Sequence, residues 1–238
     1  MLWAIAAAAA VVPGAGGANS LGWLAERTGR TRTFNVKDFG AAGDGRTKDT
    51  AAVEKAVAAV AAAGSGAILF PSGGRFLVGP FNVTSHCTLY IDTNASLIGS
   101  TDPDDWPLIP ALPSFGEAKK GGHLRRTSLI HGVNVTDSVV TGANGTIDGQ
   151  GAMWWLNRPG GYTPGHLIEF MWSSDVEVSN LTLTNSPFWT VTPSYTQNIH
   201  VRDVRVLAPM DRIGNTDGVN LDSCRDALVE NVWIQVCV

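Results

Sequence analysis

The chain has 238 residues, of which 44% are hydrophobic and 16% are charged, and it contains 27 glycines. This length suits one domain with a continuous core, and the many glycines suit a fold with frequent turns and short strands. The net charge is −4 and no basic run exceeds two residues, so nucleic acid is not expected as a partner.

The N-terminal segment is apolar and rich in alanine over residues 2–12, and small residues follow Pro13 as far as Ala18. This pattern predicts a secretory signal peptide at residues 1–18 and a linker at 19–33. An uncleaved membrane anchor is the alternative, but the apolar run is short for a bilayer span. Beyond the signal peptide we expect no contact with a membrane.

Sequons and cysteines also bear on the compartment. Five Asn-X-Ser/Thr sites, together with a signal-like start, predict a secreted, extracellular glycoprotein. The sequon asparagines are Asn82, Asn94, Asn134, Asn144 and Asn180. Of the three cysteines, Cys224 and Cys237 could form a disulfide in an oxidising compartment, with Cys87 left over. No cysteine or histidine spacing fits a zinc site.

The first predicted elements are a strand, a glycine-rich loop and a helix. Residues 34–36 are expected to form a strand, and 40–45 form a glycine-rich loop. A helix with one apolar valine stripe is expected from Asp49 or Thr50 through Ala63. The loop lacks the lysine and the spacing of phosphate-binding motifs. We therefore interpret the helix as a cap that covers the end of an apolar solenoid.

Short β segments repeat after this helix. Three nine-residue segments align without gaps at 175–183, 198–206 and 226–234, with offsets of 23 and 28 residues, and a looser copy begins at Asp137. Repeats of this length indicate stacked units, and short β runs separated by turns favour a parallel β-helix over a β-sandwich. Residues 34–238 are therefore predicted to form one all-β domain of this type.

Stacking predicts which side chains meet between coils. The offset of 28 residues places Trp189 one coil below Asp217 and Val191 below Val219, about 4.8 Å apart. If both valines point into the core, alternation is expected to leave Asp217 and Trp189 on the outer face. By itself "NTDG" (215–218) is an ordinary turn sequence.

Five motifs in chain order resemble the family 28 glycoside hydrolases, the polygalacturonase group of pectin-degrading enzymes, in its plant-type branch. The similarity covers roughly residues 34–234. The motifs are "GAAGDGRTKDTAA", "GTIDGQGAMWW", "RPGGYTPGHLIEF", "NLTLTNSPFWTV" and "NTDGVNLDS". The resemblance implies a right-handed parallel β-helix with a cleft for polygalacturonan along one sheet.

The resemblance also implies a reaction and its residues. The activity would be inverting hydrolysis of polygalacturonan in the cell wall by a monomer, without a cofactor or a metal. Asp217, the acid of Asn-Thr-Asp, matches one of three catalytic carboxylates. Asn215 and Trp189 are the candidates for substrate binding. Arg212, five residues before Asp217, is the local candidate for binding a substrate carboxylate.

The sequence departs from the family pattern downstream of Asp217. An Asp-Asp pair is expected near residue 238, followed by Gly-His-Gly and Arg-Ile-Lys, but the chain reads Val-Cys-Val at 236–238. We therefore expect weak or no hydrolysis from this chain, as for a truncated gene model, a splice form or a degenerate copy. A non-catalytic pectin-binding remnant is the alternative. A calcium-dependent lyase would need an acidic cluster and a basic residue that abstracts a proton. No clustered acids on aligned coils support it, and residues 102–105 are the segment for a calcium titration as a check.

Other conspicuous residues receive structural interpretations. Asp222 lies five residues after Asp217, about 16 Å along a strand, so it is interpreted as a turn acid and not as the second carboxyl group. The adjacent Trp154 and Trp155 are expected to pack over a loop. The remaining residues are expected at the surface, and they are Arg158, His166 and His200.

Overall fold

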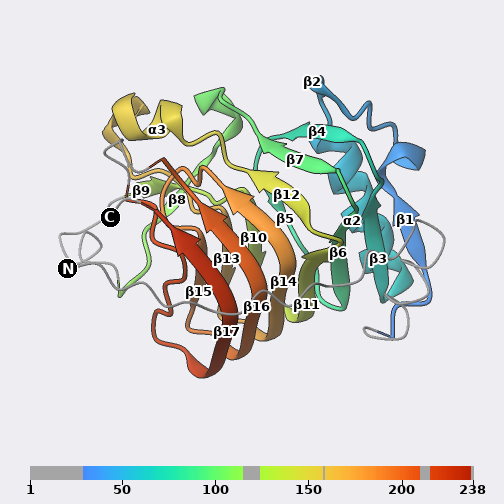
Figure 1. Ribbon diagram of the computed structural model, residues 1–238. Coiled ribbons are helices and arrows are strands. Elements are labelled where there is room, and N and C mark those ends of the chain that lie inside the picture. Colours follow the sequence, from blue (N-terminus) through green and yellow to red (C-terminus); the bar gives the residue numbers. More distant parts are fainter. Residues whose placement is uncertain (1–28, 115–123, 158, 210–214, 237–238) are drawn as a thin grey trace.

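The computed structural model describes residues 29–114, 124–157, 159–209 and 215–236, and most of it consists of stacked parallel strands (Figure 1). The predicted signal peptide, most of the linker, Arg158, Arg212 and Cys237 lie outside the described residues. The proposed pairing of Cys224 with Cys237 therefore stays a prediction. No helix among the described residues is long and apolar enough to cross a membrane.

The described elements follow each other as short strands with few helices. The helical elements are η1 (Val36–Phe39), α2 (Thr50–Ala63), η2 (Pro103–Asp105), α3 (Ala152–Asn157) and η4 (Pro159–Gly161). The largest sheet holds β1 (Thr33–Asn35), β2 (Asp44–Lys48), β3 (Gly66–Phe70), β4 (Arg75–Val78), β6 (Cys87–Ile91), β7 (Ser96–Gly99), β11 (Thr136–Gly142), β12 (Gly145–Asp148), β14 (Ser174–Thr184), β16 (Gln197–Leu207) and β17 (Arg225–Gln235). A four-stranded sheet, which we call the short sheet, holds β5 (Phe81–Asn82), β10 (Ile130–Val133), β13 (Ile168–Met171) and β15 (Val191–Ser194). A two-stranded antiparallel sheet is formed by β8 (Leu108–Pro110) and β9 (Leu124–Arg126).

Pairing between β14, β16 and β17 follows the predicted repeat. Ile199 of β16 pairs with Val176 of β14 at an offset of 23 residues, and with Ala227 of β17 at 28. Ser138 of β11 pairs with Val176, as the looser copy predicted. All pairs in both larger sheets are parallel. The predicted fold, an all-β right-handed parallel β-helix, is therefore confirmed.

The expected cap is present. Helix α2 lies at the end of the stack that begins with β1 and β3, and β17 forms the other end of the described strands (Figure 1). Its Val53 and Val60 are fully buried in the core. Asp49 occupies the N-cap position, yet its carboxylate accepts bonds from the backbone N–H groups of Ala42 and Gly43 instead. The glycine-rich loop is thereby tied to the start of the helix.

Coils turn at residues with left-handed backbone conformation. One column of such residues, in register from coil to coil, consists of Asn144, Asn180, Asp203 and Asn231. At the last three positions the long strand bends, so that its two halves lie on two faces of the β-helix. Asn and Asp accept positive φ more readily than other side chains, because a short polar group can bond locally. The Asn231 amide indeed donates to the Asp203 carboxylate in the coil below.

Candidate active site

The site is built on the short sheet, where residues 219–222 add one more coil. Val191 of β15 forms a parallel bridge with Val219, and Ser194 forms another with Asp222. The backbone N–H of Thr190 donates to the Asp217 carbonyl oxygen at 2.8 Å. Asp217 is therefore in register with Trp189, one coil apart, as the repeat predicted.

The reason given for the position of Trp189 needs correction. Trp189 precedes β15 and lies in irregular backbone, so the alternation of side chains along a strand does not apply to it. Stacking holds the indole instead: its centroid lies 5.3 Å from the His166 ring and 5.1 Å from the Phe188 ring. Its Nε1–H donates to Asn215 Oδ1 at 3.2 Å. Three of the predicted positions thus meet around the Asn-Thr-Asp turn.

The two carboxylate oxygens of Asp217 differ in their contacts with the described residues. Its Oδ2 accepts a 3.4 Å bond from the Asn220 side-chain amide. Its Oδ1 is buried and has no hydrogen-bond partner among the described residues. Buried carboxylate oxygens are rarely left unpaired, since water has been removed from them. An oxygen in this state is suited to accept a bond from a water molecule or from a substrate hydroxyl.

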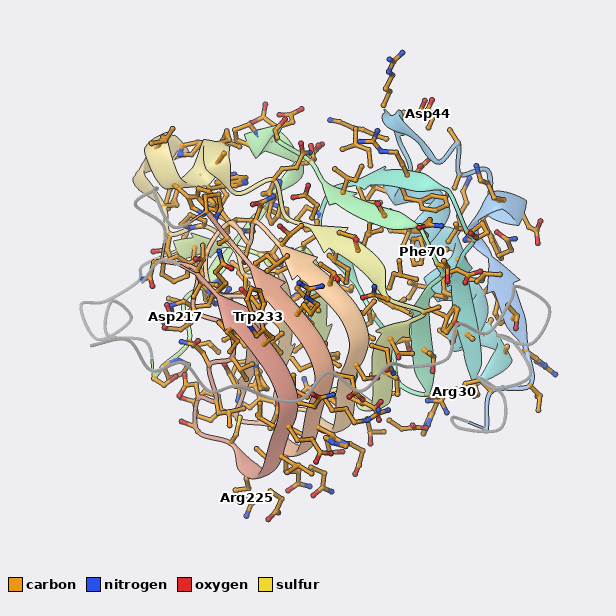
Figure 2. All side chains as sticks on the ribbon, viewed as in Figure 1. Arg30, Asp44, Phe70, Asp217, Arg225 and Trp233 are labelled. Carbon is orange, nitrogen blue, oxygen red and sulfur yellow. The ribbon has the colours of Figure 1, made fainter. Side chains whose placement is uncertain are left out.

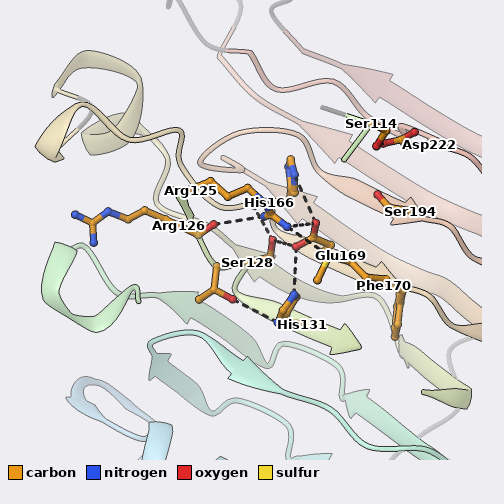
Figure 3. Close-up of polar contacts among 12 residues, drawn as sticks. Ser114, Arg125, Arg126, Ser128, His131, His166, Glu169, Phe170, Ser194 and Asp222 are labelled. Atoms are coloured by element: carbon orange, nitrogen blue, oxygen red, sulfur yellow. Dashed lines mark hydrogen bonds and ion pairs between the residues drawn. The ribbon is translucent and has the colours of Figure 1, made fainter. Parts of the chain in front are cut away.

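A buried ionic cluster lies beneath Trp189, and we define it as Arg125, Ser128, His131, His166 and Glu169 (Figure 3). The Glu169 side chain is fully buried and accepts bonds from Arg125 Nη2 at 2.6 Å and from Ser128 Oγ at 2.7 Å. Nε2 of His131 lies 3.5 Å from one carboxylate oxygen of Glu169, and Nε2 of His166 lies 3.9 Å from the other.

The charges of Arg125 and Glu169 balance each other when both histidines of the cluster are neutral. Burial acts to raise the pKa of Glu169, but the Arg125 guanidinium and the neighbouring imidazoles hold it below its usual value. Burial lowers the pKa of His166 to about 4, against the opposing pull of Glu169, and it lowers that of His131 as well. At neutral pH the cluster therefore contains one buried ion pair.

The burial of His166 contradicts the expectation of a surface role, since the side chain is only 5% exposed. Strand β9 brings Arg125 against this face of the short sheet, and Arg125 closes the cluster over Glu169. His200 agrees better with the expected surface position, since its side chain is one-third exposed. Its Nε2 lies 2.8 Å from Glu230 Oε1. Trp154 packs against Trp106, as expected for a residue that covers a loop.

Sequence reasoning missed four cluster residues, namely Arg125, Ser128, His131 and Glu169. A usable signal was present: "SLIHGV" at 128–133 and "HLIEFM" at 166–171 align without gaps. The structure pairs His131 with Glu169 in this register. A polar residue in each of two stacked apolar strands was the feature that pointed to a buried contact.

Three other acidic residues have structural roles. Asp102 and Asp105, from the segment considered for calcium, both form ion pairs with Lys48, at 3.0 and 2.8 Å. No group of three or more metal-ligating side chains occurs among the residues that the structure describes. Asp222 accepts a bond from Ser114, which ties a connecting segment across the end of the short sheet.

A family model and the curated relatives of this chain point to the same group of proteins. A family model described as glycosyl hydrolases family 28 matches residues 63–237. A probable polygalacturonase of Vitis vinifera is 46% identical over 210 residues, which is 86% of this chain and 43% of that protein. An exopolygalacturonase of Zea mays is 32% identical over 222 residues, or 89% of this chain and 49% of the relative. The chain thus spans about half the length of the curated relatives it matches.

Solved structures show the same fold at low identity. The exopolygalacturonase of Thermotoga maritima superposes with a TM-score of 0.73 at 21% identity, over 86% of this chain and 52% of that one. A family 28 exopolygalacturonase of Yersinia enterocolitica also gives 0.73, at 20% identity, over 84% of this chain and 42% of the other.

Proposed function

This chain belongs to family 28 of the glycosyl hydrolases, and from that premise we propose that it provides part of the active site of an enzyme that hydrolyses polygalacturonan in pectin. Polygalacturonases among its relatives support the reaction class. The observation that carries the assignment of the site is Asp217 Oδ1, which is buried without a hydrogen-bond partner among the described residues, beside the bonded pair of Trp189 and Asn215.

Asp217 is proposed as a catalytic carboxylate. Inverting hydrolysis needs one protonated carboxyl group to assist the leaving oxygen and one ionised carboxylate to activate water, roughly 6.5–9.5 Å apart. The buried Oδ1 can hold a water molecule or the proton that a leaving oxygen requires. Trp189 and Asn215 are proposed to place a galacturonosyl ring next to it. Arg212 remains a candidate for the substrate carboxylate.

Neither of the other acids on the described short-sheet coils fits the role of partner. Asp222 is five residues from Asp217 along an extended strand, about 16 Å away. Glu169 lies two coils and three residues away, about 14 Å between Cα atoms, and Arg125 already neutralises it. We therefore propose that the 238-residue chain hydrolyses slowly by itself, with pectin binding without cleavage as the alternative.

The test compares Asp217→Asn with Asp222→Asn on polygalacturonate, with release of reducing ends as the measurement. Asp217→Asn should reduce hydrolysis by about 10²-fold or more, the scale of losing a general acid or base, whereas Asp222→Asn should leave the rate within about two-fold of the parent chain. Equal rates for Asp217→Asn and the parent would reject the assignment. Affinity for polygalacturonate without any release of reducing ends would favour the binding function.

The location of the protein follows as a further part of the proposal. The substrate is a polymer of the cell wall, and residues 1–18 have the pattern of a secretory signal. We propose that the protein is secreted as a glycoprotein and acts in the wall. Recovery of the expressed chain from the cell-wall fraction checks this, and a purely intracellular distribution would contradict it.

A further inference from the structure

A groove lies at the end of the same coils that is opposite to Asp217, where the short sheet turns into the largest sheet. Its volume is about 560 Å³, and it is lined by the turn residues of four successive coils. A groove of this size is within the usual range for ligand sites, roughly 300–1,000 Å³. The groove contains none of the residues assigned above to hydrolysis.

Two aromatic side chains stand in this groove. The rings of Trp172 and Tyr195 are parallel within 8°, with centroids 5.8 Å apart, and Trp172 is 46% exposed. Short polar residues occupy the same turn position in the coils on either side, Asn134 below Trp172 and Ser223 above Tyr195. The aromatic pair therefore has open space at both ends of the column.

The backbone at these two residues is unfavourable for large side chains. Trp172 has φ of 50° and Tyr195 has φ of 52°, in the left-handed region. Most other non-glycine residues with positive φ in the described chain are Asn or Asp, which tolerate this conformation, whereas bulky residues rarely adopt it. Local strain of about 1–3 kcal/mol is retained where the surroundings or a function require it. Turn formation alone does not account for an indole here.

Polar groups around the rings suit a sugar. Hydroxyl and amide side chains line the groove, among them those of Thr136, Gln197 and Ser223. Arg225 is the one charged residue among the lining residues in the described part of the chain, and its Nη2 donates to Gln197 Oε1 at 3.1 Å. The nearby acid Asp175 is bonded to Thr136 and Asn198. Parallel aromatic faces contact the C–H groups of a pyranose ring, hydroxyls and amides bond its oxygens, and a guanidinium pairs with a uronate carboxylate.

We propose that the groove around Trp172, Tyr195 and Arg225 binds a segment of galacturonate chain, separately from the site at Asp217. The choice of galacturonate rests on the proposed function, whereas the assignment of a pyranose ring rests on the groove itself. Figure 2 shows Asp217 and Arg225 at different ends of the last described coil. Six residues of extended chain separate Asp217 from Ser223, about 20 Å, so the two sites can engage different stretches of polymer.

The test uses the full chain with Asp217→Asn, so that ligand is not consumed, and with Trp189→Ala to weaken binding at the site around Asp217. Binding of a galacturonate hexasaccharide and of a neutral galactose hexasaccharide is measured by calorimetry. Trp172→Asn is the main variant, because Asn occupies the equivalent turn at residue 134 and suits the backbone. Since this change creates an Asn-Ser-Ser sequon at 172–174, the chains compared for binding are produced in a host without N-glycosylation. Trp233→Ala is the matched control, since Trp233 is 45% exposed on β17 away from the groove.

Trp172→Asn should weaken galacturonate binding on the order of ten-fold, the scale of losing one aromatic contact, and Trp233→Ala should leave it unchanged. Arg225→Gln should weaken binding of the acidic hexasaccharide and spare the neutral one. Equal binding by Trp172→Asn and its parent, or no saccharide binding by the parent, overturns the proposal. So does protection of Trp172 from oxidation by a glycan on Asn134, because the occupant would then be the chain's own carbohydrate.

Failure of this proposal is separable from failure of the proposed hydrolysis. Loss of reducing-end release in Asp217→Asn with unchanged binding in Trp172→Asn rejects only the binding groove around Trp172. Trp172-dependent binding in a chain whose hydrolysis does not depend on Asp217 rejects only the catalytic assignment.

Discussion

The indole of Trp189 lies nearly parallel to the imidazole of His166, with 13° between the ring planes and 5.3 Å between the centroids. His166 is fixed in turn within the buried cluster, where its Nε2 lies 3.9 Å from Glu169. The position of a residue proposed to hold substrate is thereby set by a histidine one coil below it.

Replacing Trp189 tests its proposed contact with substrate. In the Asp217→Asn background, Trp189→Ala should weaken binding of a galacturonate oligomer about ten-fold, because an aromatic contact is lost. Trp189→Phe keeps the stack on His166 and loses the bond to Asn215, so its effect should be smaller. Calorimetric titration measures both, with Trp233→Ala as the control. Unchanged affinity in Trp189→Ala would remove this residue from the site.

Stability should depend on pH through His166. Its pKa is about 4 in the folded chain and about 6.5 when unfolded, so the unfolded state binds more protons between these values. The contribution of His166 to the free energy of unfolding is therefore fully present above about pH 6.5. As the pH drops to 4, the free energy of unfolding should fall on the order of 3 kcal/mol. Depression of the pKa of His131 acts in the same direction.

The variant His166→Phe isolates this effect. Phenylalanine can keep the stack with Trp189, and His166 Nδ1 has no hydrogen-bond partner to lose among the described residues. Urea denaturation between pH 4 and 7.5 should show a shallower loss of stability than in the parent chain. His200→Gln serves as the control outside the buried cluster and should retain the full slope. An unchanged slope in His166→Phe would contradict the assignment.

Breaking the buried ion pair should cost far more than breaking a surface pair. Arg125→Met leaves the Glu169 carboxylate buried without its guanidinium and should destabilise the chain by about 3–5 kcal/mol. The double variant Arg125→Met with Glu169→Leu should recover most of that loss. Lys48→Met breaks two solvent-screened pairs with Asp102 and Asp105 and should change stability far less than Arg125→Met does.

Denaturant titration at neutral pH measures these differences as shifts in the midpoint at constant slope. Equal losses in Arg125→Met and Lys48→Met would show that the buried pair has no special weight. A double variant less stable than Arg125→Met alone would show that the carboxylate has other partners strong enough to stabilise it.

A close backbone approach next to His166 makes Gly165 sensitive. A Cβ atom at this position would lie 1.8 Å from the Thr127 carbonyl oxygen and 3.0 Å from Ser128 Cα, so backbone would have to move. Gly165→Ala should therefore destabilise the chain by more than about 2 kcal/mol, in the range of overpacked cores. Gly161→Ala meets open space and only adds left-handed strain, about 1–2 kcal/mol. Thermal unfolding of both variants makes the comparison.

Local pattern was sufficient to predict the coils. The offsets of 23 and 28 residues specify the pairing of β14, β16 and β17, because an in-register parallel ladder places like residues above each other. The same offset placed Trp189 below Asp217. The helix at 50–63 was predictable from its valine spacing and from the glycine that ends it.

An asparagine in an Asn-X-Ser/Thr sequence can be a glycosylation site, and it can also be a turn residue of the β-helix. Asn94, Asn134, Asn144 and Asn180 all have positive φ, from 53° to 59°, so the turns of a β-helix by themselves favour Asn at these positions. Glycosylation at these sites stays a prediction, and the frequency of sequons is partly a property of the fold.

By itself, the sequence determined the repeat, its register and the meeting of Trp189 with the Asn-Thr-Asp turn, because a ladder of coils repeats at intervals that can be read along the chain. Only the tertiary structure decided that His166 is buried with Glu169 and that Trp172 and Tyr195 form one groove. Burial depends on Arg125, whose strand β9 lies outside the repeat and contacts Glu169 from 44 residues away. The shape of a turn depends on backbone conformation, which a tryptophan in a sequence does not indicate.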